Sequence, residues 1–108
     1  MLRDERDYLL RMIAAAAATA TLLRQRLVGG TQPDEIIQEA RAAQGELLGK
    51  DAALLRALDP SSAAHVLGDK ERLAAWADLL RIEAEAHRKV GRVDEANALD
   101  RRADALTK

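Results

Sequence analysis

The chain has 108 residues, with 17 basic and 18 acidic side chains and a formal net charge of −1. This balance argues against nucleic acid as a partner, because proteins that bind a phosphate backbone present a surplus of basic residues. The absence of cysteine excludes disulfides, thiolate nucleophiles and cysteine-ligated metals. Alanine, leucine, arginine and glutamate dominate, and no stretch has the alternating apolar pattern of a strand. We therefore predict one all-α domain over residues 1–108.

Glycine, proline and aspartate residues divide the chain into predicted helices joined by short loops. The pair Gly29-Gly30 should end a long N-terminal helix, and Pro33 fits the first position of the next helix. Asp51 and Asp69 are candidate N-caps of later helices. The predicted helices cover about 4–28, 33–48, 51–58 and 60–67, followed by a hairpin of two helices over about 70–106.

The N-terminal helix is predicted to carry an apolar seam at heptad spacing. Alanines in the middle of the seam allow a second helix to approach closely, and larger side chains lie at both ends. An antiparallel pair of such helices matches itself, as a two-fold interface requires. We therefore expect a homodimer formed through this helix; the alternative is that the seam packs against its own chain. The seam residues are Leu9, Ile13, Ala16, Ala20, Leu23 and Leu27.

Apolar residues also lie off the seam, and Leu10, Met12 and Leu22 widen the apolar surface beyond what one partner helix would cover. The uncharged run from Met12 to Leu23 is 12 residues long and mostly alanine. A membrane span needs about 20 strongly apolar residues, so we expect no interaction with a membrane. The first residues mix acidic and basic side chains, unlike a secretory signal, and we expect a cytoplasmic protein.

The last third of the chain carries small residues at helical spacing on both sides of a turn glycine. In this pattern, from Ala77 to Lys108, the sequence resembles a tetratricopeptide repeat. Glu83 stands where such repeats usually have leucine, Asp100 stands where an aromatic residue is usual, and no proline closes the unit. The resemblance implies an antiparallel helix pair, although arrays of such repeats generally need three or more units. The matching residues are Ala84, His87, Gly91, Ala96 and Ala103.

The N-terminal string DYLLRMI, from Asp7 to Ile13, precedes a helical body and this C-terminal hairpin. In this order of features the chain resembles a family of bacterial proteins that has no assigned activity. The resemblance implies the same helical architecture in a bacterial protein. It implies no substrate, cofactor or mechanism.

Residues with possible chemistry are few. Glu83 and His87 lie four residues apart on one predicted helix face, a spacing that paired metal ligands use, but no further ligands accompany them. The other acidic residues alternate with arginine and lysine at helical spacing, as on solvated helix faces. We therefore expect no metal, cofactor or catalytic residue. The alternative is an enzyme or a small-molecule binder with an aliphatic pocket between helices, in which Tyr8, Glu83 and His87 converge.

Trp76 is the only tryptophan of the chain. It shares a predicted helix face with Leu73 and Leu80, which favours a place in the core. An exposed Trp76 would instead be the natural anchor of a peptide or protein partner. Taken together, the sequence favours a structural or protein-interaction module that forms a homodimer and that could bind a protein or peptide partner.

Overall fold

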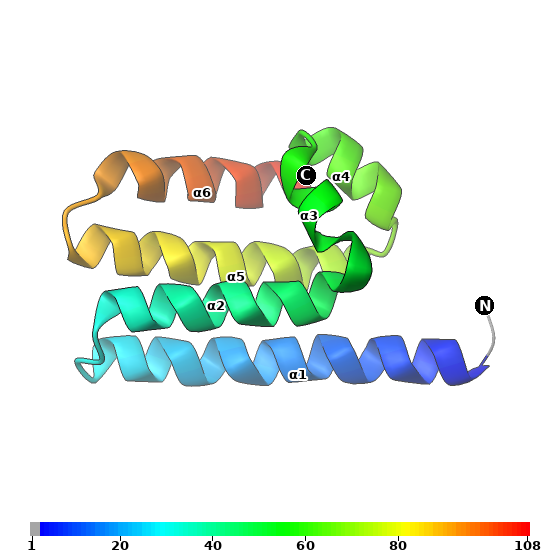
Figure 1. Ribbon diagram of the computed structural model, residues 1–108, viewed down its shortest axis with the longest axis horizontal. Helices are drawn as coiled ribbons and strands as arrows, with labels where there is room; N and C mark the ends of the chain where they lie inside the picture. Colours follow the sequence, from blue (N-terminus) through cyan, green and yellow to red (C-terminus); the bar gives the residue numbers. More distant parts are fainter. Residues whose placement is uncertain (1–2) are drawn as a thin grey trace.

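The computed structural model describes residues 3–108, which fold into helices and connecting turns without a strand (Figure 1). This confirms the predicted all-α class, and the observed helix bounds lie close to the expected ones. The helices are α1 (Arg3–Val28), α2 (Pro33–Leu48), the 3-10 turn η1 (Gly49–Asp51), α3 (Ala52–Ala57), α4 (Pro60–Leu67), α5 (Lys70–Lys89) and α6 (Val93–Leu106).

Two antiparallel hairpins form the body of the molecule, α1 with α2 and α5 with α6 (Figure 1). Helix α2 packs against α5 and so joins the two hairpins, and α1 also contacts α5. The short helices α3 and α4 lie at one end, where α4 packs against α5 and α6. The first turns of α1 extend beyond the end of α2 (Figure 1). The fold therefore leaves one long side of α1 at the edge of the molecule.

Local sequence signals explain most of the helix ends. Pro33 occupies the first turn of α2, and Asp69 caps α5 by accepting a hydrogen bond from the backbone N–H of Arg72 at 2.9 Å. The predicted cap at Asp51 is wrong, since its side chain makes no capping hydrogen bond. The chain enters α3 directly from η1, and the carbonyl group of Gly49 accepts the backbone N–H of Ala52, so the turn itself supplies a partner at the start of α3.

The core is aliphatic around a single aromatic side chain. Trp76 is fully buried, which confirms its predicted place in the core. Isoleucine and leucine side chains from α1, α2, α3 and α5 fill the space around it. None of the helices within residues 3–108 combines the length and the apolar character that a membrane crossing requires. The other largest buried apolar side chains are Leu23, Ile36, Leu47, Leu55, Leu79 and Ile82.

Candidate functional site

The apolar seam of α1 faces α2 and α5 of the same chain. Ala20 and Leu23 are each 1% exposed, and Ile13 is partly buried against the core. Leu9, Ala16 and Leu27 are also buried. The seam therefore packs within its own chain, which was one of the two possibilities that the sequence left open. A second copy would therefore have to use the opposite face of α1.

That opposite face is exposed and carries no charge along its middle. Ala14, Ala17 and Ala18 are exposed, and the larger side chains of Leu10 and Leu22 are 40% and 53% exposed. The helices of a globular protein usually present charged residues to solvent on this side. A helix with apolar residues both inward and outward has a surface that its own chain does not cover.

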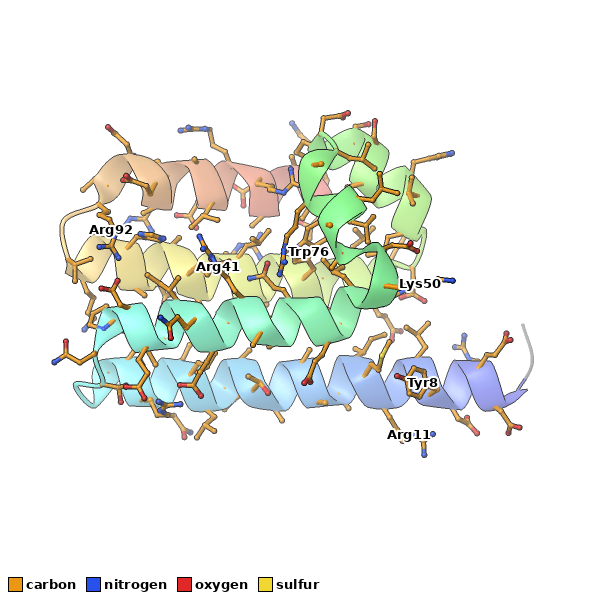
Figure 2. The ribbon with its side chains drawn as sticks, viewed as in Figure 1. Tyr8, Arg11, Arg41, Lys50, Trp76 and Arg92 are labelled. Atoms are coloured by element: carbon orange, nitrogen blue, oxygen red, sulfur yellow. The ribbon has the colours of Figure 1, made fainter. Side chains whose placement is uncertain are left out.

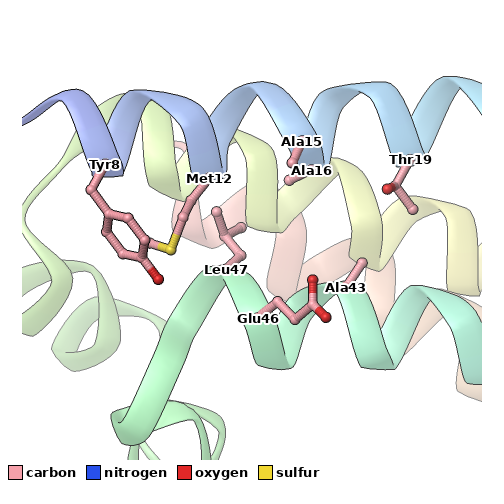
Figure 3. Close-up of a pocket in the computed structure, with 8 residues that line it drawn as sticks. All are labelled: Tyr8, Met12, Ala15, Ala16, Thr19, Ala43, Glu46 and Leu47. Atoms are coloured by element: carbon pink, nitrogen blue, oxygen red, sulfur yellow. The ribbon is translucent and has the colours of Figure 1, made fainter.

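A shallow groove runs between α1 and α2 beside this face (Figure 3). Its volume is about 270 Å³. The side chains of Tyr8 and Met12 extend from α1 toward α2, and Glu46 extends from α2 toward α1 (Figure 3). Ala15 and Ala43 line its middle, and the hydroxyl groups of Tyr8 and Thr19 and the carboxylate of Glu46 add polar atoms to a mostly apolar lining. It enlarges the apolar surface at the edge of the molecule.

A polar network crosses the contact between α2 and α5. Glu83 is 2% exposed and accepts hydrogen bonds from Gln44 Nε2 and from Arg41 Nε, the latter at 2.9 Å. Gln44 in turn accepts a hydrogen bond from the indole N–H of Trp76 at 3.2 Å. A buried carboxylate is costly unless such partners surround it. The network therefore supplies hydrogen-bond donors to Glu83, the only acidic side chain found buried among the described residues.

Two further arginines lie beside this network. The guanidinium of Arg102 stacks 5.3 Å from the centre of the Trp76 ring, within the range of a cation–π contact. It also donates hydrogen bonds to the carbonyl groups of Leu55 and Leu58 at the end of α3. Arg56 donates to the backbone carbonyl of Arg41 at 3.0 Å. Figure 2 shows Arg41 and Trp76 between the ribbons of α2 and α6.

The three residues that the alternative prediction would place in one pocket lie apart. Tyr8 lines the groove between α1 and α2, whereas Glu83 belongs to the network beside Trp76. His87 accepts a hydrogen bond from Arg92 Nε on its Nδ1 at 2.8 Å and contributes to neither place. Within residues 3–108, no group of three or more potential ligands is placed to hold a metal ion.

The basic end of α1 is held by ion pairs to its neighbours. Arg24 forms a two-pronged pair with Asp78 of α5, at 2.5 and 3.2 Å. This hydrogen bonding raises the pKa of the Arg24 guanidinium. Arg26 approaches Glu39 of α2 at 2.7 Å. Because these side chains are more than a quarter exposed, each pair adds only modestly to stability.

The arginines around Trp76 and the buried Gln44 were not predicted from the sequence. One signal was present: Gln44 occupies an apolar position of its helix, four residues after Ala40 and three before Leu47. A polar residue at such a position needs a partner in the core. Its partner Glu83 lies 39 residues away in sequence, and nothing local connects the two.

Comparison of the chain with models of known protein families, with curated proteins and with solved structures found no match.

Proposed function

We propose that the protein is a non-catalytic interaction module that self-associates through the outward face of α1. The observation that carries this proposal is the exposed, uncharged surface between Met12 and Leu23, with Leu10 and Leu22 exposed at its two ends. Exposed apolar patches of this kind mark interaction sites more often than ordinary surface. The seam on the inner side of α1 holds the helix on the body of the molecule and fixes the direction in which this face points.

A second copy of the chain fits this face better than an unrelated protein does. The outward residues are spaced by four and three along α1, as in a helix pair, and the spacing is symmetric about Ala16. Two antiparallel copies centred there bring Ala14 opposite Ala18, where small side chains allow close approach. The central row of outward residues is, in chain order, Asp7, Arg11, Ala14, Ala18, Thr21 and Gln25, and the exposed side chains of Leu10 and Leu22 flank this row.

The helix dipoles favour the same antiparallel arrangement. Antiparallel copies place the N-terminal end of one helix near the C-terminal end of the other and so oppose the two dipoles. A parallel pair would bring like ends of the two dipoles together. The groove that contains Tyr8 and Met12 adjoins the face and adds contact area.

The oligomeric mass and one surface substitution test this proposal. The full chain should behave in sedimentation equilibrium as a particle of twice 11.8 kDa at micromolar concentration. Ala18→Glu should shift the chain to a monomer, because a carboxylate cannot be buried unpaired between two helices. It should leave the helical circular dichroism unchanged, because Ala18 is exposed in the folded chain. Ala98→Glu, at an exposed position of α6, is the matched control and should remain a dimer.

A further variant, compared with Ala18→Glu, separates the two faces of α1. Ala20→Glu should unfold the chain, since Ala20 is only 1% exposed within the core. A wild-type chain that stays monomeric at micromolar concentration would overturn the proposal. So would an Ala18→Glu variant that remains a dimer.

We further infer that the α5–α6 hairpin is a single unit of tetratricopeptide-repeat type. Complete burial of Ala84, Ala96 and Ala103 supports this, because the two helices of such a unit touch through small residues. Gly91 in the connecting turn has φ of 82°, a conformation that favours glycine. The resemblance of the N-terminal segment to a bacterial family supports a bacterial origin.

A further inference from the structure

Three arginines line one small pocket above the buried Gln44–Glu83–Trp76 network. The pocket has a volume of about 280 Å³ and lies where α2, α3, α5 and α6 meet. Arg41 reaches it from α2, Arg56 from α3 and Arg102 from α6. Leu99 of α6 supplies an apolar wall. Residues from distant parts of the sequence thus bring three positive charges to one place.

The positive charge of the pocket exceeds its negative charge. Glu83 is the only acidic residue in its lining, and this carboxylate is already held by Gln44 and Arg41. Within residues 3–108, Arg56 and Arg102 have no carboxylate at ion-pair distance. Burial lowers the pKa of the Arg102 guanidinium, and Asp59 offsets this only in part. An anion in the pocket would relieve the repulsion among the three guanidinium groups.

Folding leaves most of the hydrogen-bond donors of these arginines unused. A guanidinium carries five N–H donors. Arg41 uses its Nε on Glu83, and Arg56 uses one Nη on the carbonyl of Arg41. Arg102 is fixed by two carbonyl groups and by the Trp76 ring, so its position is set before any ligand arrives. A guanidinium group that is held in place, as that of Arg102 is, and neighbouring guanidinium groups with free donors are well suited to the two oxygens of a carboxylate or phosphate.

The folded chain accounts for two of the three arginines without a ligand. Arg41 neutralises Glu83, and Arg102 binds the end of α3 and covers Trp76. Arg56 has neither role, since it is exposed and contacts only a carbonyl group that could equally bind water. An unpaired arginine beside two other arginines adds repulsion and no stabilising ion pair.

We propose that this pocket binds a small organic anion, with Arg41, Arg56 and Arg102 donating hydrogen bonds to its carboxylate or phosphate oxygens. The apolar part of the ligand lies against Leu99. The pocket is slightly smaller than the range of about 300–1,000 Å³ that is typical of drug-sized ligands, so the anion is small. This site lies away from the outward face of α1, and its occupancy does not depend on self-association.

Fluorescence of Trp76 reports on the pocket directly, because it is the only tryptophan of the chain and Arg102 stacks on its ring. We would titrate the full chain with inorganic phosphate, butyl phosphate and butyrate, keeping the ionic strength constant with sodium chloride. Binding predicts a saturable fluorescence change and a rise in melting temperature for at least one of these anions. A stronger response to butyl phosphate than to butyrate identifies the ligand as a phosphate ester, and the reverse identifies it as a carboxylate.

Substitution of Arg56 provides the decisive comparison, because its exposed side chain can be replaced without disturbing the core. Arg56→Gln should weaken binding about tenfold, and Arg56→Lys should recover part of the loss, since charge is restored without the forked geometry. Arg101→Gln removes the same charge from an exposed position of α6 outside the pocket lining and should bind as the wild type does. Absence of a saturable response to all three anions would overturn the proposal, as would equal weakening by Arg101→Gln and Arg56→Gln.

Discussion

Gln44 of α2 donates a hydrogen bond to Glu83 of α5 inside the core, with 2.5 Å between Nε2 and Oε2. Each of these residues is 2% exposed. The oxygen of the Gln44 amide accepts a hydrogen bond from the indole N–H of Trp76, so one side chain connects a carboxylate to the only tryptophan. Since buried polar groups must find partners, this arrangement fits only one register of α2 along α5.

Removal of the Glu83 carboxylate should destabilise the fold substantially. Glu83→Ala leaves the Gln44 amide without an acceptor and opens a cavity, and we expect it to lower the free energy of unfolding by about 2–3 kcal/mol. Removing one partner of a fully buried ion pair costs about 3–5 kcal/mol. The loss is smaller here, because the Arg41 side chain is 64% exposed and remains hydrated. Urea denaturation followed by circular dichroism measures this difference.

Two companion variants identify the cause of that loss. Glu83→Gln keeps an acceptor for Gln44 and should cost only about 1 kcal/mol. Glu85→Ala, at an exposed position two residues along α5, should change stability by less than about 0.5 kcal/mol. Equal stability of Glu83→Ala and the wild type would show that the network does not stabilise the contact between α2 and α5.

Substitutions of Trp76 separate the hydrogen bond of its indole from the volume of its ring. Trp76→Phe removes the donor to Gln44 and should cost about 2 kcal/mol, and Trp76→Ala also removes the ring and should cost about 4 kcal/mol. Circular dichroism during urea denaturation is the measurement, because the variants lack tryptophan fluorescence. A phenylalanine variant as stable as the wild type would contradict the role assigned to this hydrogen bond.

Helix positions could be predicted from the sequence because local residues determine them. The Gly29-Gly30 pair, Pro33 and Asp69 act on backbone groups a few residues away, and the structure has helix ends at each of them. The burial of Trp76 could also be predicted, because its apolar neighbours share one helix face. Such signals do not depend on which helices become neighbours.

Contacts between helices could not be predicted in the same way. Three acidic residues that the sequence places on solvated helix faces form ion pairs with a neighbouring helix: Asp78 with Arg24, Asp104 with Arg81 and Asp100 with Arg88. The positive pocket escaped prediction for the same reason, since Arg41, Arg56 and Arg102 come from three helices. A chain with nearly balanced charge can still form a local cluster of positive side chains, and the packing of the helices determines where that cluster lies.

Two glycines should respond in opposite ways to alanine. Gly45 lies inside α2, and a Cβ added there would meet no atom within 4 Å. Gly45→Ala should therefore raise the free energy of unfolding by about 0.5–1 kcal/mol, since alanine loses less backbone entropy on forming a helix. Gly91→Ala also meets no steric obstacle, but φ of 82° strains any L side chain, and we expect a loss of about 1 kcal/mol.

Thermal unfolding of both glycine variants, followed by circular dichroism, checks these signs. The pair controls for side-chain size, because the same methyl group is added into open space in each case. Destabilisation by Gly45→Ala would mean that the middle of α2 is not an unstrained helix at this residue.

Asp59 should make the stability of the protein depend on acidic pH. Its carboxylate accepts hydrogen bonds from the hydroxyl of Ser62, at 2.6 Å, and from the backbone N–H of the same residue, at 3.1 Å. These bonds lower the pKa of Asp59 below its ordinary value. A carboxyl group whose pKa is lower in the folded state than in the unfolded state stabilises the fold at pH values above its unfolded pKa. This stabilisation is lost as the pH falls through the pKa of the folded state.

Replacement of Asp59 by asparagine isolates this effect, because asparagine caps a helix about as well and does not titrate. We expect Asp59→Asn to match the wild-type melting temperature near neutral pH. Between about pH 5 and pH 2 the wild type should lose stability faster than the variant, because only the wild type has to protonate its cap. Melting curves of the two proteins across this range measure the difference. The other carboxylates are present in both proteins, so their titration cancels in this comparison. Parallel curves would show that the Asp59 cap contributes nothing that depends on its charge.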